Sequence, residues 1–369
     1  MNSYYPASDD RRDYDERPRH YDREARRARR RRRAMLRRLR ILAVLAVVAL
    51  TITAAVALID RQPEPPAPVT EAPQEMLAAS APEPEIIEPE EPEWSIHATE
   101  NTAQVGADFP SQYVLLMDLE SGEVLAQRER TARINPASMT KILTLLVSAE
   151  QVTTGALEMG HFTMTRAVAD YTYSNNCSVV GYEVDEVIPV KELFYGCILC
   201  SGADACMGLA LTIFGSHEAI VDAMNDKLEE LGLSETSHFT NCVGLYDENH
   251  YTTVEDMAII MKAALDNEFC REVMSTITYQ SIPTPQHKEG QVLSNLFSRR
   301  IQYQDTGAIT VSCAKTGYVE ESGFCAASYG ENSDGQGFIC VTGKSTGTQQ
   351  SIKDHAALYK QYCPGEIAE

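Results

Sequence analysis

Residues 134 to 144 read INPASMTKILT, and the interpretation of the whole chain depends on this stretch. Ser138 stands three residues ahead of Lys141, and the apolar run that follows predicts a helix over residues 138–150. Side chains at positions i and i+3 share one face of a helix, so this hydroxyl and this amine can touch. A hydroxyl is a good nucleophile only beside a base, which makes the pair a candidate for covalent catalysis. The alternative is that Ser138 caps the helix and Lys141 is a solvated charge.

Two further stretches accompany this pair. Residues 200–206, CSGADAC, place Ser201 at a helix entry, and residues 313–318, CAKTGY, place Lys315 at the end of a late strand. Each stretch alone is explained by a helix cap or by a strand that leads into a turn. Together and in this order they form the S-x-x-K, second-serine and K-T-G pattern of penicillin-binding proteins and class A β-lactamases.

The sequence resembles the serine D-alanyl-D-alanine carboxypeptidases, which are low-molecular-mass penicillin-binding proteins, over about residues 110–345. The resemblance extends to the sequence around and between the motifs, such as YGCILCSGADACMGLA and FTNCVGLYDENHYTTVEDMA. It implies an α/β (α+β) domain with the β-lactamase/transpeptidase-like fold, in which helices flank an antiparallel sheet beside a helical lobe. The patterning agrees, because a hairpin over 112–129, a helical middle, three strands within 307–343 and a helix over 349–363 follow one another. We expect the ligand in the cleft between sheet and lobe.

The resemblance assigns catalytic roles to three residues. Ser138 would attack the carbonyl between two D-alanines and form an acyl-enzyme. Lys141, in its neutral form, would take the serine proton. Ser201 would pass a proton to the departing amine and would bridge Lys141 and Lys315.

The third motif would bind the substrate. Lys315 and Thr316 would hold the terminal carboxylate by charge-assisted contacts. Gly317 would leave room for the substrate backbone along the strand edge. The resemblance makes the backbone N–H groups of Ser138 and Tyr318 the oxyanion hole.

One position departs from the family pattern. The second motif usually ends in Asn, and here the third residue is Ala203, so a substrate-orienting amide is absent. We expect Asp204, one residue later, to point elsewhere on its helix. His250 and Asn241 lie in loops that could line the cleft.

The N-terminal part predicts a membrane anchor. Residues 1–40 hold 15 Arg against seven Asp and Glu, a charge of +8, which leaves −29 for the remainder of a chain whose net charge is −21. Residues 41–59 contain no charge and are long enough for a transmembrane helix. The Arg cluster before them predicts that 1–40 is a cytoplasmic tail and that the catalytic domain is extracytoplasmic, although such a cluster also suits nucleic acid or anionic lipid. The composition predicts a disordered Pro/Glu-rich linker at residues 60–95, and we expect the catalytic domain at 96–369.

The apolar run predicts a single-pass protein of the bacterial cell membrane, and the resemblance implies that it removes the terminal D-Ala of peptidoglycan stem peptides and binds β-lactams. We expect no cofactor, no metal and no nucleic-acid partner, and we interpret the ten cysteines as small buried hydrophobes. A zinc carboxypeptidase would need ligands that the sequence does not offer. A β-lactamase would need a deacylating Glu that we cannot assign. A cell-wall peptide-binding module with weak turnover is the alternative from a different class, and Ala203 is the residue that favours it.

Overall fold

The computed structural model describes residues 94–364 except 153–156 and 159. The expected tail at 1–40, the transmembrane helix at 41–59 and all but the last two residues of the linker lie outside the described residues. Among the residues that are described, we find no helix that combines enough length and enough apolar character to cross a bilayer.

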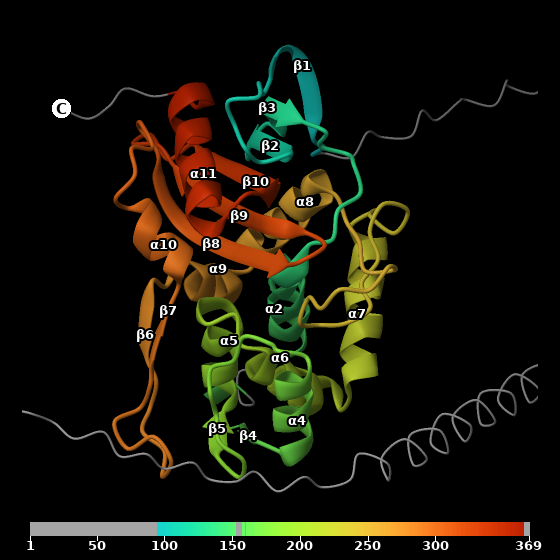
Figure 1. Cartoon of the computed structure of the whole chain (residues 1–369), viewed down its shortest axis with the longest axis vertical. Coiled ribbons are helices and arrows are strands. Elements are labelled where there is room, and N and C mark those ends of the chain that lie inside the picture. The colour runs from blue at the N-terminus through green and yellow to red at the C-terminus, as the bar shows by residue number, and fades with distance from the viewer. Residues whose placement is uncertain (1–93, 153–156, 159, 365–369) are drawn as a thin grey trace, which may run out of the picture. The chain divides into compact units, whose positions relative to one another are not determined.

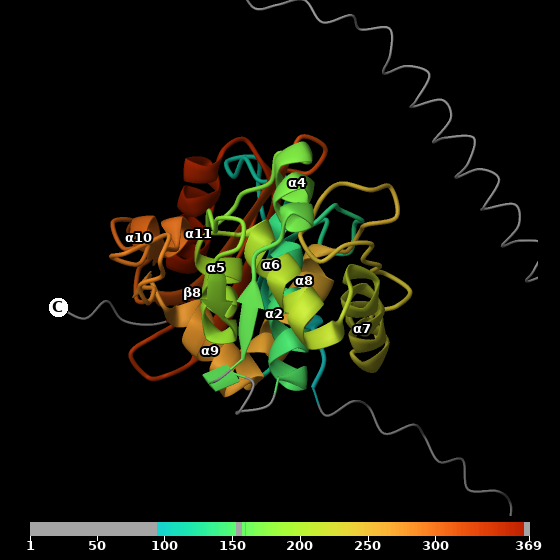
Figure 2. The same ribbon diagram turned by 90° about the horizontal axis from the view of Figure 1, so that it is seen from below.

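The described chain forms a six-stranded sheet with helices on both faces and a helical lobe beside it (Figures 1 and 2). The strands of the sheet are β1 (His97–Gln104), β2 (Tyr113–Asp118), β3 (Glu123–Arg128), β8 (Thr310–Val319), β9 (Gly323–Glu331) and β10 (Gly337–Ser345). The helices are α2 (Thr140–Gln151), α4 (Arg166–Ser174), α5 (Val190–Leu199), α6 (Ala203–Leu209), α7 (His217–Glu230), α8 (Val254–Asp266), α9 (Glu268–Ser275), α10 (Leu296–Ile301) and α11 (Thr348–Tyr362). The described residues also form a 3-10 turn η1 (Ala137–Met139) and a π-helical turn η2 (Ala210–Phe214). Two small hairpins pair β4 (His161–Thr163) with β5 (Val187–Pro189) and β6 (Thr278–Gln280) with β7 (Val292–Ser294).

The strand order is β1-β3-β2-β10-β9-β8, and the hairpin predicted over 112–129 is confirmed as β2 and β3. Every neighbouring pair is antiparallel except β1 with β3, which is parallel, so the expected antiparallel sheet is observed for all of its strands except β1. The cause lies at the start of β1. Trp94 donates its indole N–H to the carbonyl of Leu119, and the N–H of His97 bonds to the carbonyl of Gly122. Because β1 therefore starts at the β2–β3 turn, it has to run in the direction of β3.

The sheet separates two apolar cores. Along β2, Leu115 and Met117 pack into the larger core with α2, α5 and α8, whereas Val114 and Leu116 pack into the smaller core with α10 and α11. This alternation is the period of two that a strand imposes. The central strands β2 and β10 are buried on both faces, so each face of the sheet packs against its own apolar core.

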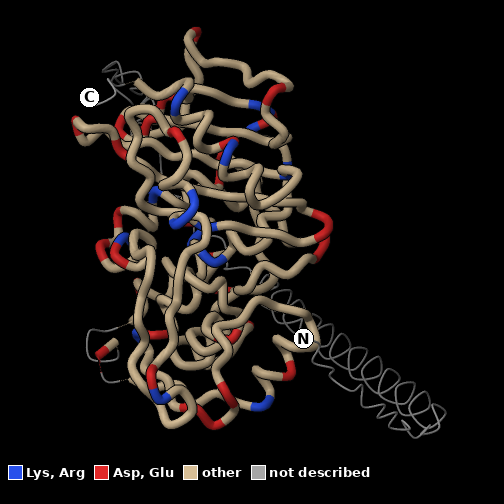
Figure 3. Tube along the Cα trace, turned by 60° about the vertical axis from the view of Figure 1, so that its left-hand side comes forward, with Lys and Arg blue, Asp and Glu red and all other residues tan. Residues whose placement is uncertain are grey.

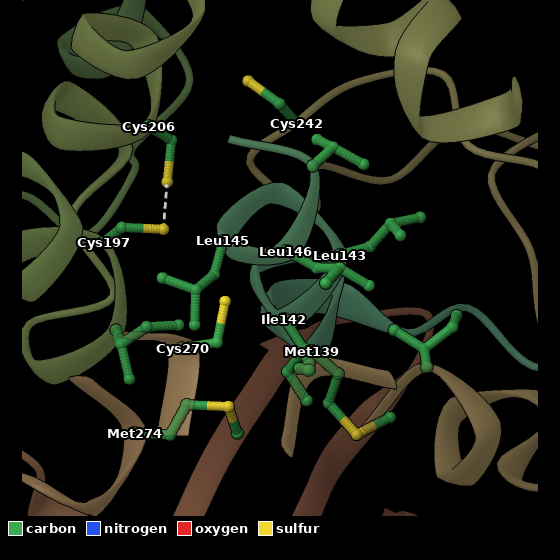
Figure 4. Packing of buried hydrophobic residues seen from close by; sticks show 14 of the residues in the cluster. Met139, Ile142, Leu143, Leu145, Leu146, Cys197, Cys206, Cys242, Cys270 and Met274 are labelled. Atoms are coloured by element: carbon green, nitrogen blue, oxygen red, sulfur yellow. Dashed lines mark hydrogen bonds between the residues drawn. The ribbon is translucent and has the colours of Figure 1, made fainter. Parts of the chain in front are cut away.

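All ten cysteines are free, and seven of them are buried. Figure 4 shows the side chains of Cys197 and Cys206 pointing toward each other beside α2. Their sulfur atoms are 3.1 Å apart. The interpretation of the cysteines as apolar core material is confirmed for these seven. Charged residues of both signs are interspersed along the described chain (Figure 3).

Candidate active site

Ser138 lies in a tight turn that precedes a buried helix. The predicted helix exists, but the α-helical part begins at Thr140, and Ser138 occupies the 3-10 turn before it. Ala137 has φ +46°, a left-handed conformation that costs a non-glycine residue about 1–2 kcal/mol. The carboxamide oxygen of Asn135 accepts the N–H of Ala137 at 2.9 Å and stabilises this turn.

Lys141 contacts Ser138 as the spacing predicts. Its Nζ lies 3.0 Å from Ser138 Oγ and donates to the carbonyl of Val243 at 2.6 Å. The lysine is 2% exposed, so its ammonium group is largely shielded from solvent. Asn241 shapes the loop that carries this carbonyl, because its Oδ1 accepts the N–H groups of Gly244 at 2.7 Å and Leu245 at 2.9 Å.

A second lysine and serine form a matching pair. Lys315 Nζ, on β8, donates to Ser201 Oγ at 2.9 Å, and Ser201 occupies the turn between α5 and α6 with φ +54°. Burial lowers the pKa of Lys315 to about 7, and the positive charge of Lys141 contributes to the same shift. The expected bridge of Ser201 between both lysines is not formed among the described residues, where the serine pairs with Lys315 and Lys141 is directed to Ser138 and Val243.

Both pairs lie at one cleft of about 420 Å³ between the lobe and the sheet. The residues of the three motifs that line it are Ser138, Lys141, Ser201, Thr316, Gly317 and Tyr318. Lys315 is buried and is not among the lining residues, and it meets the cleft through its contact with Ser201. Strand β8 is an edge strand of the sheet, so its outer edge is available to pair with an extended peptide.

Gly317 permits a close approach within the chain itself. A Cβ at this position would lie 2.7 Å from the carbonyl oxygen of Pro136 and 2.9 Å from the nitrogen of Ser138. Gly244 approaches the same turn from the other side, where a Cβ would lie 2.0 Å from the carbonyl oxygen of Ala137. Both glycines therefore make room for the turn that carries Ser138, a reason that differs from the substrate contact expected from the sequence.

Replacing Gly317 with Ala should displace this turn and lower the rate of acylation by a penicillin about 10²-fold, since a shift near 1 Å is enough for such a loss. Gly343→Ala on β10 is the control, because a Cβ there would meet side-chain atoms of Tyr113 at 3.2 Å and no part of the turn. The rate of labelling by a fluorescent penicillin measures both variants. Equal labelling of the two would show that the turn tolerates the displacement.

Asp204 points away from the cleft, as expected. Its buried carboxylate accepts the N–H groups of Val180 and Gly181, both at 2.9 Å, and so holds the chain after α4 against α6. Ala203 lines the cleft with its methyl group, and beside it the same wall is formed by Asn175, Asn176, Cys177 and Ser178.

The two loop residues that the sequence suggested for the cleft have other positions. Asn241 and His250 are both buried and neither belongs to the lining of the catalytic cleft. Asn241 orders the 243–245 loop, and His250 contacts Thr140 behind the nucleophile. Nothing in the sequence pattern pointed to Asn135, Thr140 or the carbonyl of Val243, because their roles come from hydrogen bonds to distant segments. Within residues 94–364, apart from the five that are not described, no group of three or more His, Cys, Asp or Glu could hold a metal ion.

Comparison with known proteins gives one family. The family model described as D-alanyl-D-alanine carboxypeptidase matches residues 98–343. D-alanyl-D-alanine carboxypeptidase DacF of Bacillus subtilis is 32% identical over 239 residues, which cover 65% of this chain and 59% of that protein. D-alanyl-D-alanine carboxypeptidase DacA of Escherichia coli K12 is 30% identical over 224 residues, or 57% of this chain and 50% of that protein. The chain thus spans between half and three fifths of the length of these curated relatives.

Solved structures show the same fold. The Streptomyces K15 DD-transpeptidase superposes with a TM-score of 0.60 at 24% identity, over 68% of this chain and 97% of that one. A D-alanyl-D-alanine carboxypeptidase from Mycobacterium tuberculosis H37Rv gives 0.60 at 23% identity, over 69% and 92%. At these identities the likeness establishes the arrangement of sheet and lobe. The side-chain geometry of the cleft has to supply the chemistry.

Proposed function

Because the chain belongs to the D-alanyl-D-alanine carboxypeptidase family, we propose that it removes the terminal D-Ala from peptidoglycan stem peptides through an acyl-enzyme on Ser138. The observation that carries the proposal is the pair of lysine–serine contacts at one cleft, Lys141 with Ser138 at 3.0 Å and Lys315 with Ser201 at 2.9 Å. One pair supplies a nucleophile with its base. The other supplies a cation for a carboxylate and a hydroxyl for proton transfer.

Substrate binding begins at Lys315 and Thr316. The terminal carboxylate stabilises the ammonium form of Lys315 and raises its pKa from the value of about 7 that burial and Lys141 impose. A substrate without a free carboxylate offers Lys315 no partner and would be a poor one.

Acylation follows from this arrangement. Ser138 Oγ attacks the carbonyl carbon of the penultimate D-Ala while its proton passes to Lys141 Nζ. The N–H groups of Ser138 and Tyr318 donate hydrogen bonds to the carbonyl oxygen and stabilise the negative charge that develops on it. The C–N bond breaks as the leaving amine takes the proton held on Lys141 by way of Ser201, and D-Ala departs. Water then attacks the ester carbonyl as Lys141 takes its proton, and this proton returns to Ser138 Oγ as the shortened peptide leaves.

Release of D-Ala by the full chain in detergent tests the proposal. A peptide ending in D-Ala-D-Ala should yield free D-Ala, whereas the same peptide with a C-terminal amide should react far more slowly, because it offers Lys315 no carboxylate. A fluorescent penicillin should label the protein with a stoichiometry near one. Failure of a folded protein to release D-Ala and to bind penicillin would contradict the enzyme and favour the peptide-binding module.

An added amine separates hydrolysis from transfer. If the acyl-enzyme forms but a D-amino acid acceptor captures most of the acyl group, the protein is a transpeptidase. Hydrolysis that persists in excess acceptor supports a carboxypeptidase. Rapid release of hydrolysed penicillin would instead identify a β-lactamase.

We further propose that residues 41–59 anchor the chain in the bacterial membrane and that 60–95 hold the catalytic domain outside the cytoplasm. The uncharged run of 19 residues and the Arg-rich flank before it support this placement. Extraction of the full chain from membranes by detergent and not by alkaline carbonate is the expected result. A variant that lacks residues 1–60 should appear in the soluble fraction.

A further inference from the structure

Behind the nucleophile, a buried histidine is joined to the turn of Ser138 by a chain of hydrogen bonds. His250 Nδ1 lies 3.0 Å from the N–H of Thr240, which is a donor, so Nδ1 has to be the acceptor. The proton of the neutral ring is therefore on Nε2. His250 is 1% exposed, and burial lowers its pKa to about 3, which is consistent with a neutral ring.

The direction of the remaining bonds follows from this tautomer. Nε2–H donates to Thr140 Oγ1 at 2.8 Å, and Thr140 donates its own hydroxyl proton to the carbonyl of Ala137 at 2.7 Å. Each group in the chain is a donor to the next, and bonds aligned in this way strengthen one another. The chain ends on the peptide between Ala137 and Ser138, whose N–H belongs to the nucleophile.

A second contact fixes the same turn from the histidine's backbone. The side chain of Asn135 donates to the carbonyl of His250 at 2.8 Å and accepts the N–H of Ala137 at 2.9 Å. His250 is thus linked to the carbonyl of Ala137 through Thr140 and to its N–H through Asn135. Ala137 is the residue with the left-handed φ of +46°. Backbone strain of this kind persists only where surrounding contacts determine it.

We propose that Thr140 and His250 are positioning residues for acylation, which hold and polarise the Ala137–Ser138 peptide so that its N–H faces the developing oxyanion. The nitrogen of Ser138 lies between Gly244 and Gly317, 2.9 Å from where a Cβ on either would be, so the peptide has little room in any other orientation. The hydroxyl of Thr140 polarises the carbonyl of this peptide and makes its N–H a better donor. The inference rests on the proposed acyl transfer.

The domain contains a matched pair of the same kind elsewhere. Thr342 Oγ1 lies 2.9 Å from Nε2 of His355, both residues are buried, and burial lowers the pKa of His355 to about 3. This pair joins β10 to α11 and makes no hydrogen bond to the turn of Ser138. A variant at Thr342 leaves a buried histidine unpaired just as the same variant at Thr140 does, so the two should lose similar stability. Only the variant at Thr140 should also lose the positioning of the turn.

The test compares Thr140→Val, Thr140→Ser and Thr342→Val in the full chain. Thr140→Val should lower kcat for D-Ala release and the rate of penicillin acylation by 10- to 100-fold, roughly the loss that a displaced catalytic group causes, with KM within twofold of wild type. Thr140→Ser keeps the hydroxyl and should recover most of the rate. Thr342→Val should lower Tm by a similar amount and leave kcat unchanged. His250→Phe, compared with His355→Phe, repeats the test from the other end of the chain of bonds.

Several outcomes would overturn the inference while leaving the proposed function intact. Wild-type kcat in Thr140→Val, with a Tm as low as that of Thr342→Val, would make the pair a stabilising contact only. A raised KM with unchanged kcat would also contradict it, because positioning of the oxyanion hole acts on the transition state. If the wild-type chain reacts with neither substrate nor penicillin, the proposed function itself fails, which is a separate result.

Discussion

Ser138→Ala should abolish D-Ala release and penicillin labelling, with a loss in kcat of at least about 10³-fold and a Tm close to that of wild type. The reason is that the variant lacks the atom that forms the acyl bond, and removing a nucleophile leaves only the contribution of the remaining site. Ser138 is partly exposed at the cleft, so the fold does not depend on its hydroxyl.

The experiment also decides between two serines. Ser201 accepts a hydrogen bond from a lysine just as Ser138 does, so its geometry alone resembles that of a nucleophile. Labelling that persists in Ser138→Ala and maps to a peptide containing Ser201 would reverse the two roles. Ser148→Ala, on the helix α2 that follows Ser138, is the control, because the buried Oγ of Ser148 has no hydrogen-bond partner among the described residues. That variant should react as the wild type does.

Lys315→Met should lower kcat/KM for a peptide with a free carboxylate by about 10²- to 10³-fold, which corresponds to the loss of a charge-assisted contact in a dry site. The amide-capped peptide should lose much less, since it never makes this contact. Lys262→Met provides the control, because Lys262 pairs with Asp266 on the surface of α8. An equal loss for both peptides would show that Lys315 serves the chemistry and not the carboxylate.

The pH dependence of the wild type follows from the same lysine. With a pKa of about 7 in the free enzyme, Lys315 loses its charge as the pH rises, so kcat/KM for the carboxylate substrate should fall above pH 7. The peptide with the amide should not show this decrease. A kcat/KM that stays flat from pH 7 to 9 would contradict the role of the ammonium group.

The free energy of unfolding, in contrast to kcat/KM, should rise with pH. The folded pKa near 7 lies below the ordinary value of 10.5, so the unfolded chain binds more protons between these two values and the free energy of unfolding rises with pH across that window. The cost of the buried charge is fully present below pH 7 and is relieved toward pH 10.5. Lys315→Met should remove this dependence and melt at a higher temperature than wild type at pH 6. Urea unfolding at pH 6 and pH 9 measures the difference.

The local pattern of the sequence was sufficient for many elements. The hairpin over 112–129, the helix after Ser138 and the strands that became β8, β9 and β10 all follow from periodicity and turn residues. Strand β1 was missed because its residues are mostly exposed and show no alternation, and its parallel pairing depends on contacts of Trp94 and His97 with the β2–β3 turn. The hairpin β6–β7 was missed as well, since each of its strands has only three residues.

The sequence by itself determined the chemical groups of the site and the proximity of Ser138 to Lys141, because a spacing of three on a helix turn is a local property. Only the tertiary structure decided the pairing of Ser201 with Lys315, the contact of Lys141 with Val243, and the hydrogen-bond chain from His250 to Ala137. Apart from the local bond between Thr140 and Ala137, these contacts join residues 102 to 114 positions apart. Such partners are chosen by how the lobe packs on the sheet and by which buried donors still need acceptors, and neither is visible in the pattern of a single segment.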